Sequence, residues 1–144
     1  MNLLRLAEAV ALYEDALQFV GDKIDPITNP PSLTFCSSAE CSRSFGFTFQ
    51  GAYTVGTVGI VIGPRGWKPY FVRHELIHHL QLERIGALRV WLFKPTWFVE
   101  GMAYSLSEDP RRPLPEPLEG YRAKFERWFV KVGKGQVWRE AAKL

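Results

Sequence analysis

Two histidines four residues apart constrain this chain more than any other feature of its sequence. They lie in the segment HELIHH, residues 74–79, which holds all three histidines of the protein. Residues i and i+4 share one face of an α-helix, one turn apart, so both imidazoles can reach the same ion. Zinc takes imidazole nitrogen at about 2.0–2.1 Å in a tetrahedral site. We therefore predict a helix whose His74 and His78 bind Zn²⁺.

The surrounding residues favour a buried helix over a chance match on a surface. Apolar residues recur at helical spacing from Pro69 to about Ile85, and Gly86 is typical of a helix end. Titratable side chains on such an apolar helix are costly unless they are paired or bound to a metal. Glu75 sits beside the first ligand and can act on water held by the metal without ligating the metal itself. His79 lies about 100° around the helix from that face, which favours a packing role.

A catalytic zinc needs a third protein ligand as well as an open position. No further histidine exists, so the three-histidine metal site is excluded. Glu100 is the best acid, because it lies among apolar and small residues in WFVEGMA (97–103), where a lone carboxylate needs a partner. Gly101 and Ala103 are expected to let its helix approach the histidine helix closely. Cys41 is the rival ligand, since peptide deformylases combine HExxH with an upstream cysteine, and AECSR (39–43) resembles their pattern faintly.

Length and composition indicate one globular domain spanning residues 1–144. Of these residues 47% are hydrophobic and 14% aromatic, which argues against disorder. Such a chain can bury a core without a structural metal, which favours a functional role over a structural one for a metal site here. The net charge is +3, with seven Lys or Arg against three Glu from Glu119 onward. These charges alternate with apolar residues, which favours a solvated helix face over nucleic-acid binding.

The remaining sequence predicts helices at both ends of an α+β fold with a small mixed or antiparallel sheet. Strands are expected at 32–38 and, as two or three strands, within 45–63, followed by a turn at 64–66. Helices are expected at 3–20, ended by Gly21, from Trp97 to about Ser107 with Thr96 as N-cap, and from 118 onward with a break at 133–135. Residues 87–95 are expected to form a connector, and the proline-rich stretch 108–117 neither helix nor central strand.

HELIHH followed by PTWFVEGMAYSLSEDPR (95–111) resembles the gluzincins, zinc peptidases with HExxH on one helix and a glutamate ligand on a second. The WxxEGxA pattern is most similar to collagenase-like and small bacterial members, and FCSSAECSRSFG (35–46) looks like the region before their active site. The resemblance covers about residues 32–110. It implies a zincin-like fold, a peptide or protein substrate, His74, His78 and Glu100 as metal ligands and Glu75 as general base.

One position departs from the gluzincin pattern. Thermolysin-like enzymes carry an aspartate four residues after the ligand glutamate, where it orients a ligand histidine, and here that position is Tyr104. Its hydroxyl is a candidate catalytic donor, with Tyr121 as the other available phenol, and core packing is the alternative. The strand 56–63 is expected at a sheet edge, where an extended peptide can pair with it, unless it is a core strand paired on both sides.

Other functions and locations remain open at this stage. A non-catalytic zinc-binding domain derived from a gluzincin is the alternative function, because the chain is short for this group. A basic module acting on DNA-bound protein has only the C-terminal charge in its favour. Cys36 and Cys41 either pair across a tight loop in an oxidising compartment or stay free thiols. With no apolar stretch long enough to cross a bilayer, we expect a soluble chain, with the cytoplasm slightly favoured.

Overall fold

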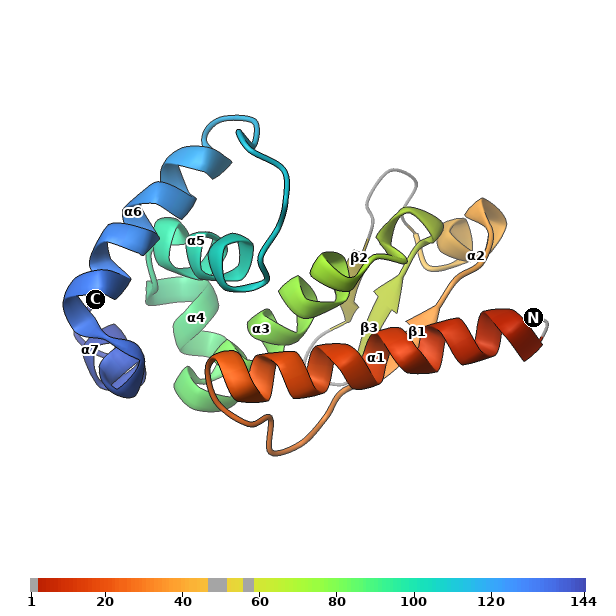
Figure 1. Ribbon diagram of the computed structural model, residues 1–144, viewed down its shortest axis with the longest axis horizontal. Coiled ribbons are helices and arrows are strands. Elements are labelled where there is room, and N and C mark those ends of the chain that lie inside the picture. The colour runs from red at the N-terminus through yellow and green to blue at the C-terminus, as the bar shows by residue number, and fades with distance from the viewer. Residues whose placement is uncertain (1–2, 47–51, 56–58) are drawn as a thin grey trace.

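The computed structural model describes residues 3–46, 52–55 and 59–144, which form a mainly helical α+β fold (Figure 1), as predicted. Its α-helices are α1 (Leu3–Lys23), α2 (Ala39–Ser44), α3 (Pro69–Ile85), α4 (Ala87–Phe93), α5 (Thr96–Leu106), α6 (Leu118–Val132) and α7 (Val137–Ala141). Short 3-10 helices lie at Pro64–Gly66 and Lys134–Gln136. The strands are β1 (Ser32–Phe35), β2 (Ala52–Val55) and β3 (Gly59–Ile62). Within these ranges no helix is both long and apolar enough to span a membrane.

The strands form one mixed sheet in the order β1-β3-β2. β3 runs parallel to β1, with Leu33 opposite Ile60, and antiparallel to β2, with Thr54 opposite Ile60. Because β3 is paired on both sides, the expectation that the strand before the histidine helix lies at a sheet edge is wrong, and the core-strand alternative holds. Residues 56–58 of that predicted strand lie outside the described residues.

Helix α3 begins and ends where the sequence predicts. Pro69 is its first residue, a position that has no use for a backbone N–H, and Gly86 ends it with a φ of 100°. The side of α3 that faces the core is apolar and fully buried at Val72, Leu76, Ile77 and Leu80. Helix α1 packs along α3 (Figure 1), so the histidine helix lies in the middle of the fold.

Helix α5 is held between α3 and α6. A Cβ added at Gly101 would lie 2.4 Å from the carbonyl oxygen of Tyr121 and 2.7 Å from Cβ of Phe125, both on α6. The expectation that Gly101 allows close approach to the histidine helix is therefore wrong, since the close contact is with α6. Ala103 is fully buried in the core. The tight α5–α6 contact fixes the helix that carries Glu100.

Two predicted helix boundaries and one predicted connector are wrong. α1 continues through Gly21 to Lys23, because Val20 and Ile24 are both buried and packing outweighs the glycine's low helix propensity. The predicted connector 87–95 contains α4, which buries Val90 against the core. α5 begins at Thr96, so Pro95 is the capping residue and no side chain caps the helix.

The other predicted elements are close to those observed. The strand expected at 32–38 is shorter and ends at Phe35, and β2 and β3 lie in the segment expected to hold two or three strands. Residues 47–51 of that segment are outside the described residues. The stretch 108–117 is neither helix nor strand, and the C-terminal helices break at 133–136, as predicted. Cys36 and Cys41 form a disulfide bond.

Candidate metal centre

The side chains of His74, His78 and Glu100 meet between α3 and α5. Each offers one ligand atom, and these atoms lie within 4.8 Å of one another. The two histidine Nε2 atoms are 3.1 Å apart. Glu100 places Oε2 3.7 Å from Nε2 of His74 and Oε1 3.6 Å from Nε2 of His78. No second group of three such ligands comes together among the residues that the structure describes.

These separations are close to those around one tetrahedral zinc, whose ligand atoms at about 2.0–2.1 Å from the ion lie roughly 3.3 Å from each other. The two Nε2 atoms are 3.1 Å apart, and each faces a different oxygen of Glu100, at 3.7 Å from His74 and 3.6 Å from His78. The donor set of two imidazoles and one carboxylate is one that catalytic zinc sites use. The side chains of His74, His78 and Glu100 are 13%, 12% and 29% exposed, so the cluster is reachable from solvent.

The local structure explains why the histidines converge. Their i, i+4 spacing on α3 stacks the rings one turn apart, with centroids 4.7 Å apart and planes at 81°. The edge-on arrangement turns both Nε2 atoms toward Glu100. That residue lies on α5, whose neighbours Val99 and Met102 are buried in the core and fix its rotation.

Gln81 orients one of the two histidines, and the sequence analysis missed it. Nδ1 of His78 lies 2.9 Å from Oε1 of Gln81, which as an amide oxygen can only accept, so Nδ1 carries the hydrogen. That leaves Nε2 to face the cluster. Gln81 is fully buried and donates from Nε2 to the carbonyl oxygen of Val99 at 3.0 Å. One amide therefore ties the ligand on α3 to the residue beside the ligand on α5.

The two histidines have opposite charge preferences in this arrangement. Burial and the neighbouring His78 lower the pKa of His74 to about 3. Burial also disfavours a charge on His78, but contacts with Glu100 and Gln81 outweigh it and raise the pKa of His78 to about 9. Burial opposes ionisation of Glu100, but the close approach of His78, with Nε2 3.6 Å from Oε1, holds the pKa of Glu100 below its usual value. Near neutral pH, His78 therefore donates an Nε2 proton toward neutral His74 and ionised Glu100.

Glu75 and Tyr104 lie beside the cluster. The charge of Glu75 favours protonation of His78 and disfavours ionisation of Tyr104. The Tyr104 ring packs edge-on against His74, with centroids 4.5 Å apart. Burial, with the charge of Glu100, raises the pKa of Tyr104, so its hydroxyl stays protonated near neutral pH. The structure thus brings both predicted catalytic residues to the predicted metal ligands.

The ion pair between Arg111 and Asp109, near the cluster, was also missed by the sequence analysis. Arg111 donates to both carboxylate oxygens of Asp109, with Nε–Oδ1 at 2.9 Å and Nη2–Oδ2 at 2.6 Å. Asp109 is almost fully buried, and both charges act on His74, the carboxylate favouring and the guanidinium opposing its protonation. The segment EDPRR (108–112) was interpreted only as a loop, because spacing along a chain does not show where a loop returns.

The remaining candidates lie outside the cluster. His79 packs away from it and places Nε2 2.7 Å from the carbonyl oxygen of Asn29, in keeping with the predicted packing role. Cys41 is bonded to Cys36 and offers no thiolate, which removes the deformylase-like alternative. Tyr121 lies on α6, where its backbone carbonyl faces Gly101.

Comparison with protein-family models, curated proteins and solved structures finds no match for this chain.

Proposed function

We propose that this chain is a zinc-dependent peptidase of the gluzincin type. One observation carries the proposal: two imidazole nitrogens of α3 and a carboxylate of α5 converge within 4.8 Å of one another, and two imidazoles with one carboxylate form a donor set that catalytic zinc sites use. A partly buried hydrogen bond from Nδ1 of His78 to Oε1 of Gln81 supports it, because metal-binding histidines are usually oriented by a partner on the other ring nitrogen.

His74, His78 and Glu100 would hold the ion. Zinc bound there would supply a Lewis acid and lower the pKa of a bound water to about 7. Glu75 takes a proton from the attacking water while the water oxygen bonds to the substrate carbonyl carbon. Glu75 then gives that proton to the leaving amine nitrogen as the carbon–nitrogen bond breaks. Water and peptide are thereby converted into a carboxylic acid and an amine, with no other reactant.

Tyr104 is proposed as a donor to the oxygen that gains negative charge during attack. Its ring lies against His74, and its raised pKa keeps the hydroxyl proton available. Its second role in the proposal is to restrict the His74 ring, at the position where thermolysin-like enzymes use an aspartate.

The test separates metal binding from catalysis by comparing wild type with two single substitutions on α3. Wild type purified without added metal should contain stoichiometric zinc and cleave an unfolded protein or a peptide library. Glu75→Gln should keep its zinc and lose cleavage, because the base is lost while every ligand remains. Glu83→Gln is the matched control, since Glu83 is on the same helix but accepts hydrogen bonds from the backbone of Thr28 and Asn29. It should keep both properties.

Two results would change the assignment. Cleavage that persists in Glu75→Gln would show that Glu75 is not the base. Wild type that holds zinc but cleaves nothing across varied substrates would favour the alternative, a non-catalytic zinc-binding interaction domain.

A further inference from the structure

Helix α4 exposes four large apolar side chains on a single short helix. Leu88, Trp91, Leu92 and Phe93 are 69%, 61%, 64% and 69% exposed, and we call these four residues the α4 patch. Scattered exposed apolar residues are ordinary, but a contiguous group marks an interaction surface. On the helical repeat the four residues and Arg89 occupy one continuous arc, and Val90 on the opposite side is buried.

The helix that carries the patch is firmly attached to the rest of the fold. α4 starts directly after Gly86 and packs against α3. At its C-terminal end, Lys94 donates from Nζ to the carbonyl oxygen of Ala141 at 2.9 Å, which ties α4 to the end of α7. The apolar side chains therefore project from a fixed support, so they do not belong to a loose segment that could fold back over the core.

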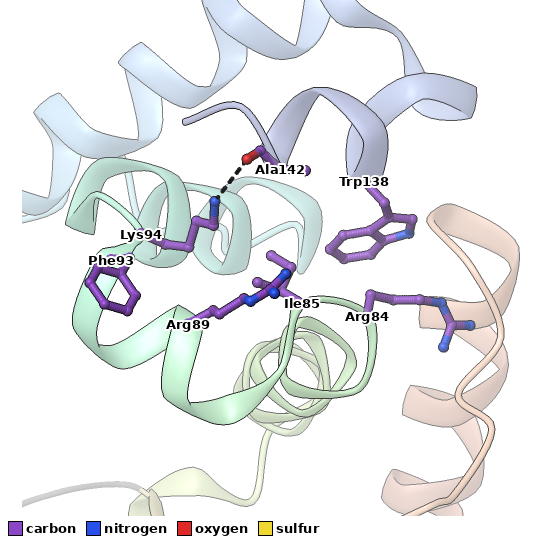
Figure 2. A pocket seen from close by; sticks show the side chains of 7 residues that line it. All are labelled: Arg84, Ile85, Arg89, Phe93, Lys94, Trp138 and Ala142. Atoms are coloured by element: carbon purple, nitrogen blue, oxygen red, sulfur yellow. Dashed lines mark hydrogen bonds between the residues drawn. The ribbon is translucent and has the colours of Figure 1, made fainter.

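The surroundings of the patch are basic. From Arg84 to Lys94 the sequence contains three basic and no acidic residues. Arg84 is paired with Asp25, whereas Arg89 shares no ion pair within the described residues. A cavity of about 280 Å³ adjoins the patch, and Phe93, Arg89, Lys94 and Trp138 are among the residues that line it (Figure 2). An apolar projection next to a basic hollow is complementary to a surface whose outer layer is anionic and whose inner layer is apolar.

We propose that α4 docks this protein on the surface of an anionic phospholipid bilayer. Leucine and aromatic side chains of the α4 patch enter the boundary between headgroups and acyl chains, as in interfacial helices. Arg89, which shares no ion pair within the described residues, then meets a lipid phosphate. This is a peripheral attachment, and it does not depend on the proposed peptidase activity.

The charge around the patch favours an anionic bilayer over a second copy of the chain. A second copy seated on the same patch would bring like charges together, because residues 84–94 include three basic and no acidic side chains. An anionic surface attracts those same basic residues.

The proposal is tested by flotation of the full chain with vesicles. Wild type should float with vesicles of phosphatidylcholine mixed with phosphatidylglycerol, and much less with phosphatidylcholine alone. Leu88→Ser/Leu92→Ser should weaken partition on the order of 100-fold, from two lost leucines. Arg89→Glu should weaken it on the order of 10-fold or more, since the charge is reversed at the surface. Circular dichroism checks that each variant is folded.

A matched pair of substitutions controls for exposed leucine in general. Leu3 and Leu4 are 84% and 81% exposed at the start of α1, so Leu3→Ser/Leu4→Ser removes the same atoms elsewhere and should leave partition unchanged. Trp91 should shift its emission to the blue on binding, and Trp91→Phe should still float without that shift.

Each opposite result overturns the proposal. Wild type that does not float with anionic vesicles, or floats equally with neutral ones, contradicts it. The same holds if the α4 double variant floats as well as wild type, or if the Leu3/Leu4 control loses binding to the same extent. A lipid-free dimer that Leu88→Ser/Leu92→Ser dissociates, seen by analytical ultracentrifugation, would assign the α4 patch to a second copy.

Discussion

Helices α3 and α4 follow one another across Gly86, yet they depart from the usual distribution of polarity in opposite ways. α3 buries polar side chains, including His79 and Gln81, within a mostly apolar core. α4 exposes four large apolar side chains and buries Val90. Each departure lowers the stability of the fold unless a compensating contact forms. Natural sequences retain such departures mainly at functional sites. Gln81 contacts the metal-ligand candidate His78, whereas the four exposed side chains of α4 are left uncovered by the residues that the structure describes.

The largest expected effect is on zinc binding, and it should be confined to α3 and α5. His78→Ala should weaken zinc affinity well beyond the roughly 100-fold upper range for loss of an outer partner, because a direct ligand is lost. Leu88→Ser/Leu92→Ser should leave zinc affinity unchanged. Competition with a chromophoric chelator measures both, and equal loss in both would mean that the two helices are not functionally separate.

Stability should distinguish the apolar residues of the two helices. Leu80→Ala should lower the free energy of unfolding by about 2–5 kcal/mol, since Leu80 is fully buried and its loss leaves a cavity. Leu92→Ala should change it by less than about 0.5 kcal/mol, since Leu92 is already exposed. Urea unfolding of the metal-free protein gives both values. A large cost at Leu92 would show that the α4 patch is covered within the chain.

Gln81→Leu tests whether a buried polar group of α3 serves the metal. The variant loses the acceptor that fixes the His78 ring, so zinc affinity should fall about 10–100-fold. His79→Gln is the control, because His79 contacts the backbone of Asn29 outside the cluster, and its zinc affinity should be that of wild type. A Gln81→Leu protein that is less stable but binds zinc normally would reduce Gln81 to a packing role.

The smallest effect per step, up to about tenfold for each pH unit, is a dependence of zinc affinity on pH. Because the pKa of His78 is raised to about 9, its proton must leave before the ring can ligate, so binding at pH 7 should release about one proton. Affinity should then rise up to about tenfold per pH unit between pH 7 and 9 and level off above. In the metal-free protein the same raised pKa stabilises the fold below pH of about 6.5, and this contribution is lost as pH rises through 9.

Calorimetry in buffers of different ionisation enthalpy counts the released protons. A count near zero at pH 7 would contradict the assigned charge of His78.

The sequence predicted those features that depend on local pattern. Proline is favoured at the first position of a helix and glycine just after its last, so Pro69 and Gly86 predict the ends of α3. The i, i+4 spacing of its histidines places them on one face. α4 was missed because its apolar residues lie nearly all around the helix, so the sequence shows no alternation of an apolar and a polar face. Without that alternation, residues 87–95 were interpreted as a connector. Gln81 could not be found, since its role depends on the carbonyl of Val99, which only the packing of α5 on α3 brings near.

The same reasoning applies to Gly101 and to the cysteines. A glycine next to a ligand indicates a close approach, but sequence does not tell which helix approaches, and that helix is α6. Cys36 and Cys41 allowed either thiols or a disulfide, and the turn into α2 brings them together. Long-range contacts decide these points, whereas periodicity reports only the local ones.

X-ray absorption at the zinc edge tests the central claim most directly, because it reports which atoms surround the ion. The zinc-loaded protein should show nitrogen and oxygen neighbours at about 2.0–2.1 Å, including two imidazoles, and no sulfur near 2.3 Å. In Glu100→Gln the first shell should change or the zinc should be lost. A sulfur neighbour, or a spectrum that Glu100→Gln leaves unaltered, would contradict the assignment of His74, His78 and Glu100 as the metal ligands.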